Sequence, residues 1–260
     1  HIYSPNSVIE AVDSREFGNY WSGTETYESL MTYIAMDFDG LRQLIVDMLG
    51  NQRCSIDVES FQNDITSFKS ADDVITLLIH MGYLAYDSKT KKVFIPNDEV
   101  RSVFLRAIRN DGWEEVIKAV DASEALLKAT LEMNEKAVAQ MIQEVHMQSS
   151  SSLIYNNEIS LSSVIALAYY SACRDYTLVR ELPTGNGFAD MVFLPKRTSL
   201  NPALVVELKW DKTAEGAISQ IKSKGYVSVL KEYKGNILLV GINYEKKSRK
   251  HQCRIEKFEM

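Results

Sequence analysis

The feature that most restricts the fold is an apolar run in the last third of the chain, Ala203-Leu204-Val205-Val206-Glu207-Leu208-Lys209. It is apolar enough for a central strand that is buried on both faces. Residues i and i+2 of a strand point to the same face, so Glu207 and Lys209 lie side by side. Burying a carboxylate and an ammonium is costly unless they pair or take part in chemistry. By themselves, these two residues favour a simple ion pair at the end of a strand.

A second acid on a neighbouring apolar strand changes this interpretation. Asp190 lies in Gly187-Phe188-Ala189-Asp190-Met191-Val192-Phe193, directly after a tight turn at Gly185-Asn186-Gly187. If this strand is the hairpin neighbour of residues 203–209, Asp190 and Glu207 converge at one end of a sheet. Two carboxylates at one point suit Mg²⁺, which takes one or two carboxylates and keeps several waters.

Two other acids are further candidates for this site. Glu158, on a helix predicted for residues 158–174, is a further candidate carboxylate. Glu181 is either an extra acid at the site or an ordinary charge on an edge strand, and the second interpretation is preferred.

The elements predicted around these residues follow the order helix, three strands, helix, two strands. This order indicates an α/β fold in which a helix crosses over between strands of one sheet. The predicted strands are 177–182, 188–194, 203–209, 236–244 and 252–258, and the second helix is 215–233 with a break near Gly225.

The first part of the chain differs, because residues 1–110 are predicted to be mostly helical. A helix capped by Ser70 or Asp72 is followed by two short strands, 83–86 and 92–95, joined by a turn. A helix followed by a β-hairpin is a winged-helix-like pattern. It is a weak indication of DNA binding, because the same unit often serves only for packing.

The segment between these parts carries apolar residues at helical spacing over residues 113–147, which predicts two amphipathic helices. We therefore divide the chain into a helical, winged-helix-like domain at 1–110, connecting helices at 111–148 and an α/β domain at 149–260.

Charge and cysteine content narrow the setting of the protein. Residues 190–260 carry 14 Lys and Arg against 8 Asp and Glu, whereas residues 1–189 carry 15 against 27. The basic C-terminal part is compatible with an anionic partner such as nucleic acid, although such imbalance also occurs by chance. Three distant cysteines without a CxxC pair argue against a disulfide framework or zinc ribbon. Reduced cysteines fit a reducing cytoplasm, which is the expected location. No run is long and apolar enough for a membrane span, so we expect no membrane contact.

Several other chemistries lack their motifs. There is no GxxxxGK[ST] phosphate-binding loop, so this chain does not hydrolyse ATP by that route. It also has no HExxH zinc motif and no GxSxG nucleophile elbow.

The last part of the chain contains, in this order, Glu158, Gly187-Phe188-Ala189-Asp190, Glu207-Leu208-Lys209 and the helix Gln220-Ile221-Lys222-Ser223-Lys224-Gly225-Tyr226. With these motifs the chain resembles the PD-(D/E)XK nuclease superfamily over about residues 150–260. The closest likeness is to the nuclease-like module that ends bacterial AAA-ATPase-like proteins. The segments 3–7, 20–24, 82–84 and 95–100 resemble the tail of that ATPase-like region. One departure is Phe188, where the family turn often carries Arg.

The resemblance implies a restriction-endonuclease-like mixed sheet flanked by helices, and roles for individual residues. Asp190, Glu207 and the Leu208 carbonyl would hold Mg²⁺ or Mn²⁺, Lys209 would orient the attacking water, and Glu158 would assist. Gln220 would position the nucleophile or the sheet, or is an ordinary surface amide. Lys222 and Lys224 would contact the phosphate backbone, or are simply solvated.

Two hypotheses follow. The first is a metal-dependent nuclease that hydrolyses phosphodiester bonds of nucleic acid, with DNA favoured. The second is a catalytically inactive nuclease-like module that binds a protein partner or an ATPase domain. The overall acidity of the chain and the presence of Phe188 support this second hypothesis.

Overall fold

The computed structural model describes residues 5–16, 26–36, 38, 40–58, 68–110, 113–149, 158–183, 187–197, 199–225, 230 and 236–258. At residues 5–7, 26–29, 110, 115, 148–149 and 158–160 the description is limited to the backbone. The chain divides into two compact units, His1–Ile117 and Lys118–Met260. The turn at Gly185-Asn186, the residue Tyr226 and the segments 3–4 and 20–24 lie outside the described residues. No described helix has the length and apolar character that crossing a bilayer requires.

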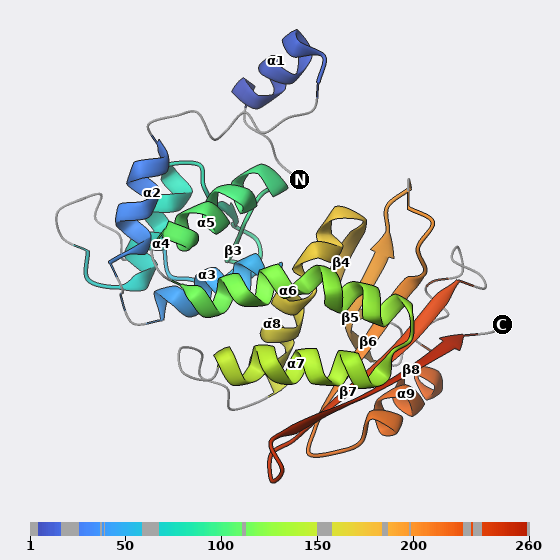
Figure 1. Cartoon of the computed structure of the whole chain (residues 1–260). Helices are drawn as coiled ribbons and strands as arrows, with labels where there is room; N and C mark the ends of the chain where they lie inside the picture. Colours follow the sequence, from blue (N-terminus) through green and yellow to red (C-terminus); the bar gives the residue numbers. More distant parts are fainter. Residues whose placement is uncertain are drawn as a thin grey trace. The chain divides into compact units, whose positions relative to one another are not determined.

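The first unit combines helices with a small antiparallel sheet of strand order β1-β3-β2 (Figure 1). Both predicted strands of the hairpin are present, and the structure adds the short strand β1, which the sequence analysis missed. The elements are α1 (Pro5–Ser14), α2 (Thr26–Ile34), α3 (Leu41–Leu49), β1 (Cys54–Ser55), α4 (Ala71–His80), β2 (Ala85–Asp87), β3 (Lys92–Phe94) and α5 (Asp98–Asn110).

Helix α4 begins where a capping box satisfies its first amides. The Ser70 side chain accepts a hydrogen bond from the Asp73 amide, and the Asp73 carboxylate accepts one from the Ser70 amide. Ser70, and not Asp72, is therefore the N-cap. Residues Val74, Ile75 and Leu78 of this helix are buried, which fixes it in the core of the unit.

The second unit is a five-stranded mixed sheet with helices on both faces, as the sequence predicted. Strand order is β4-β5-β6-β7-β8, with β6 and β7 parallel and the other neighbours antiparallel. The elements are α6 (Glu114–Leu131, which begins in the first unit), α7 (Glu135–Ser149), α8 (Glu158–Ala168), a 3-10 helix (Tyr170–Arg174), β4 (Tyr176–Pro183), β5 (Phe188–Pro195), β6 (Ala203–Trp210), α9 (Ala214–Ser223), β7 (Ile237–Glu245) and β8 (Lys250–Phe258).

Alternation along β6 separates the two faces of this sheet. Ala203 and Val205 pack with Ile218 and Ile221 of α9 in one buried cluster. Phe193, which pairs with Leu204, contacts the ring of Tyr169 at the end of α8, with 5.3 Å between ring centroids. Helices α9 and α8 therefore cover opposite faces of the sheet.

Two helices end earlier than predicted. Helix α8 stops at Ala168, and residues 170–174 form the 3-10 helix instead of continuing it. Helix α9 stops at Ser223 because Gly225 adopts a left-handed conformation, with φ of 64°. Residues 226–229 and 231–233 of the predicted longer helix lie outside the described residues.

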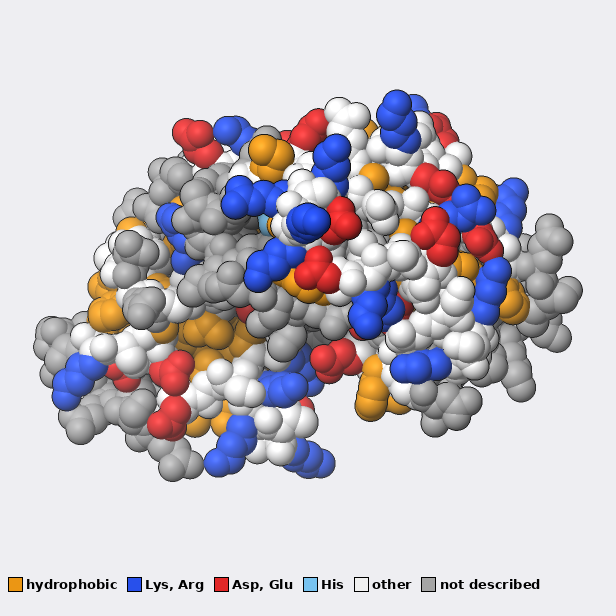
Figure 2. Space-filling model, turned by 90° about the horizontal axis from the view of Figure 1, so that it is seen from below, with side chains coloured by type: hydrophobic (Ala, Val, Ile, Leu, Met, Phe, Trp, Pro, Cys, Tyr) orange, Lys and Arg blue, Asp and Glu red, His pale blue; other side chains and the backbone are white. Residues whose placement is uncertain are grey.

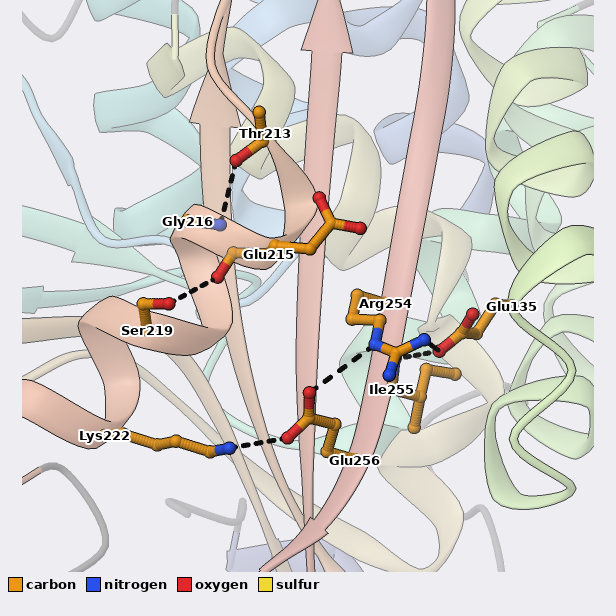
Figure 3. A network of polar contacts seen from close by, with 9 residues as sticks. All are labelled: Glu135, Thr213, Glu215, Gly216, Ser219, Lys222, Arg254, Ile255 and Glu256. Carbon is orange, nitrogen blue, oxygen red and sulfur yellow. Dashed lines mark hydrogen bonds and ion pairs between the residues drawn. The ribbon is translucent and has the colours of Figure 1, made fainter.

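Helix α7 lies along the outer edge of β8 and binds two of its outward backbone amides. The Glu135 carboxylate accepts from the Ile255 amide at 2.9 Å, and the Gln143 side-chain oxygen accepts from the His251 amide at 3.0 Å. Arg254 bridges Glu135 and Glu256, and Lys222 of α9 pairs with Glu256 at 2.6 Å (Figure 3). The network ties α7, β8 and α9 together.

A buried aromatic cluster joins α7 to the last two strands. His146 lies 4.6 Å from Tyr244 and 5.0 Å from His251 between ring centroids. Burial lowers the pKa of His146 to about 4 and that of His251 to about 3, where proximity of the two rings also contributes. Both histidines are therefore neutral in the folded protein at pH 5.

We expect acidification to destabilise the protein through these two side chains. Below pH 6.5 the unfolded chain takes up protons that the folded chain does not, so stability falls as pH drops from 6.5 toward 4, by about 1.4 kcal/mol per pH unit and per histidine. Urea unfolding at pH 7 and pH 5 measures the effect. The loss of stability between pH 7 and pH 5 should be smaller in His146→Phe than in the wild type. It should be unchanged in His80→Gln, a substitution at an exposed position. Equal pH dependence in all three proteins would contradict the assignment.

Candidate active site

The site forms where the ladder between β5 and β6 ends. The two strands pair from Phe193–Leu204 to Met191–Val206. Asp190 and Glu207 are the next residues along each strand. At this point the Asp190 side chain, and not a backbone carbonyl of β5, binds the backbone of β6. The Asp190 carboxylate accepts a hydrogen bond from the Leu208 amide at 2.7 Å. The structure thus brings the two acids together at one end of the sheet.

Glu207 is the most buried acid of the site, with 1% of its surface exposed. Its Oε1 accepts from the Lys209 ammonium at 2.8 Å and from the Gln220 side-chain amide. Its Oε2 is buried and has no hydrogen-bond partner among the described residues. A buried carboxylate oxygen without a donor is costly, and it is the type of atom that a cation or a bound water satisfies.

The surroundings of Glu207 oppose its ionisation, chiefly through burial. Burial raises the pKa of Glu207 to about 7, and the negative charge of Asp190 acts in the same direction. The hydrogen bond and charge of Lys209, and the charge of Lys224, partly offset the rise in pKa. Two carboxylates that repel each other, one of them buried, form a site that gains from a positive charge placed between them.

These residues fit a hard divalent cation such as Mg²⁺ or Mn²⁺, which binds oxygen ligands. The described residues contain no cluster of three or more His, Cys, Asp or Glu side chains able to hold a metal. A cation here would therefore depend on Asp190, Glu207, a backbone carbonyl, water and substrate oxygens. The carbonyl of Leu208 is the matching backbone candidate, because in an extended strand it lies on the same side as the amide that Asp190 binds.

Helix α9 supplies Gln220, whose side-chain amide contacts Glu207. The position of this helix depends on a glycine in β7. Gly241 in β7 is the register partner of Glu207. A Cβ added there would collide with the carbonyl of Ala214 and would lie 3.0 Å from the Cβ of Ala217. The absence of a side chain at Gly241 therefore lets α9 approach the sheet closely enough for Gln220 to reach Glu207.

The two lysines predicted to contact nucleic acid occupy different environments. Lys224 follows α9 and extends toward the beginning of β5, since its ammonium lies 3.1 Å from the position of a Cβ at Gly187. Lys222 instead pairs with Glu256 of β8 (Figure 3). Of the two, Lys224 is the cation that acts electrostatically on Glu207.

The other two candidate acids lie on α8 and β4. Glu158 is the first residue of α8, and its side chain lies outside the described residues. Ser162, one turn further along, accepts a hydrogen bond from Arg180 of β4 at 2.6 Å. Glu181 is exposed on the edge strand β4, where a φ of 51° interrupts the pairing opposite Asp190.

Sequence reasoning missed two contributors to the site. Gly241 interrupts the apolar run Leu238-Leu239-Val240-Gly241-Ile242, and a glycine inside a strand often marks a close approach of backbone. Asn243 is 1% exposed and accepts from the Lys212 amide at 3.0 Å, which holds the segment that leads into α9. A buried asparagine in a strand gives no sequence signal of that kind.

Comparison with known families agrees with this geometry. Residues 158–253 match the PD-(D/E)XK nuclease superfamily, so the second unit contains a domain of this superfamily. The match runs from the start of α8 into β8, where it ends at Cys253, and it includes Asp190, Glu207 and Gln220. No curated protein matches the chain. The predicted AAA-ATPase-like context remains a prediction.

Proposed function

We propose that the second unit is a metal-dependent nuclease that hydrolyses phosphodiester bonds of nucleic acid, with DNA as the favoured substrate. The observation that carries the proposal is the buried Oε2 of Glu207, which has no hydrogen-bond donor within the part of the chain that the structure describes and lies beside a second carboxylate and a lysine. The superfamily match supports the reaction class.

The proposed roles follow from the contacts of each side chain. Asp190 and Glu207 would hold Mg²⁺ or Mn²⁺ with the Leu208 carbonyl, and Glu158 would assist. A bound cation of this kind lowers the pKa of water and screens the phosphate. Lys209, held by Glu207, would orient the attacking water and stabilise charge that develops on the phosphate.

The remaining polar groups would position the site and the substrate. Gln220 fixes the carboxylate of Glu207, and Lys224 would contact a phosphate of the nucleic-acid backbone. Lys222 would do so only after leaving Glu256. Figure 2 shows acidic and basic side chains intermixed on the face it presents. The described side chains on this face show no continuous surface of a single sign, so we expect binding to depend on individual lysines.

Calorimetric titration with Mn²⁺ tests the metal site directly. We expect saturable binding by the wild-type chain and its loss in Asp190→Asn, because one of the two charged ligands is removed. Asp211→Asn, at an acid on the loop after β6, should bind as the wild type does. An absence of binding in the wild type, together with no hydrolysis, would favour the inactive binding module instead.

For the first unit we propose a winged-helix-like packing module at the tail of an ATPase-like region. Its hairpin follows α4, and β1 pairs with the second strand of the hairpin. Helix α4 carries Asp72 and Asp73 and has no Lys or Arg, so its side chains are poorly suited to phosphate contacts. This supports packing, or contact with an ATPase domain, over DNA recognition.

A reducing compartment, the cytoplasm, is the proposed location. Cys54, Cys173 and Cys253 are all free thiols. Burial raises the pKa of the Cys253 thiol, which keeps it protonated and unreactive.

A further inference from the structure

One aromatic ring is placed differently from the rest of its kind. Among the aromatic side chains whose burial the structure describes, Phe188 alone is exposed, at 60%. It begins β5, pairs in register with the exposed Pro183 and lies two residues before Asp190. A phenyl ring is stabilised by leaving water, so this exposed ring, two residues from Asp190, is a surface that a bound ligand can cover.

A cation accompanies this ring. Gly187 immediately precedes Phe188 and has a φ of 141°. The ammonium of Lys224 lies 3.1 Å from the position that a Cβ of Gly187 would occupy. The start of β5 therefore carries an exposed aromatic ring at Phe188, and the ammonium of Lys224 lies beside the preceding residue, Gly187. Proteins that bind single-stranded nucleic acid combine these two groups, one for the bases and one for the phosphates.

We propose that Phe188 stacks on an unpaired base close to the scissile phosphate, so that the substrate is single-stranded or locally opened nucleic acid. The inference rests on the proposed nuclease function and adds the form of its substrate. Two residues of extended strand cover about 7 Å, and consecutive stacked bases are about 3.4 Å apart, so the ring would meet a base one or two nucleotides from the cleaved bond.

The requirement for an unpaired base follows from the chemistry of the ring. Phenylalanine has no polar atom with which to read base edges, so it recognises a base through its face. In a duplex these faces are covered by the neighbouring base pairs, whereas a splayed base offers them to an aromatic side chain. Because every base has such a face, we expect little sequence preference.

Binding and cleavage by the full chain are measured separately to test the proposal. Fluorescence anisotropy in EDTA compares one oligodeoxynucleotide as a single strand and as a duplex. Phe188→Ala should weaken single-strand binding by about 5- to 150-fold, the effect of losing one stacked base, and should leave duplex binding nearly unchanged. Phe188→Trp should retain single-strand binding. Lys224→Ala should weaken both and reduce their dependence on salt.

Unchanged single-strand affinity in Phe188→Ala, or an equal loss for both forms, would overturn the proposal, and the first result would point to a protein contact at this ring. Cleavage in Mn²⁺ keeps the two proposals apart. Wild-type cleavage that prefers the single strand and loses this preference in Phe188→Ala supports both. Selective binding without any cleavage would refute the nuclease and leave the stacking role standing. Cleavage of both forms at rates independent of Phe188 would support the nuclease and refute the stacking role.

Discussion

Replacement of Glu207 by Gln is expected to lower Mg²⁺-dependent cleavage by at least about 1000-fold, a barrier increase of about 4 kcal/mol. The substitution keeps the shape of the side chain but removes the charge that would hold the cation. Lys209→Ala should have a comparable effect, because it removes the cation bonded to Glu207 at 2.8 Å. Initial rates on a labelled oligonucleotide, with and without EDTA, measure both.

A matched control is available on the neighbouring helix. Glu215 is exposed on α9, and Glu215→Gln changes the same functional group outside the site (Figure 3). It should cleave at the wild-type rate. Undiminished cleavage by both Glu207→Gln and Lys209→Ala would eliminate the proposed site.

The same Glu207→Gln substitution should stabilise the protein in the absence of metal. The pKa of Glu207 is raised to about 7 in the folded state, so its contribution to stability is lost as pH rises from about 4.5 through 7. Gln does not ionise, and the variant should exceed the wild type by up to about 3 kcal/mol at pH 8 and by little at pH 4.5. Urea unfolding in EDTA at the two pH values tests this, and a less stable variant at pH 8 would contradict it.

The second large effect is expected for Gly241→Ala. The new methyl group would collide with the carbonyl of Ala214 and press on Ala217 and Ile218, so α9 must move away from the sheet. Overpacking of this kind costs about 1–3 kcal/mol. Because Gln220 would withdraw from Glu207, cleavage should fall by about 100-fold, in line with misplacement of a site by about 1 Å.

Hydrogen exchange reads the Gly241→Ala effect locally, and the amides of β7 and α9 should lose protection. Gly40→Ala is the control, since a methyl group there has nothing within 4 Å and meets only the strain of a φ of 83°. It should leave cleavage and exchange in the second unit unchanged. Wild-type activity in Gly241→Ala would show that the close approach of α9 is not needed.

Much of the second unit follows from short-range pattern. Alternation and apolar runs locate the strands, and the i, i+2 rule places Glu207 and Lys209 on one face before any coordinates are known. The hairpin relation of β5 and β6 then brings Asp190 near. The hydrogen bond from the Leu208 amide to the Asp190 carboxylate, which replaces strand pairing at this point, could not be predicted. It depends on where the two strands separate.

The choice between the two lysines shows a second limit. Lys222 and Lys224 look equivalent in sequence, yet one pairs with Glu256 and the other extends toward Gly187. The difference comes from the end of α9 at Ser223 and from the acid that β8 presents, and both are tertiary features. The strand β1 was missed for a similar reason, since two residues carry no periodic signal.

The contact of α7 with β8 has a consequence for self-association. A strand at the border of a sheet offers free amides that another polypeptide can pair with, which is a common origin of fibrils and swapped dimers. Here the amides of His251 and Ile255 are already bound by Gln143 and Glu135. Two polar side chains thus occupy two of the outward amides of β8 and hinder intermolecular strand addition there, without any proline or bulge in the strand.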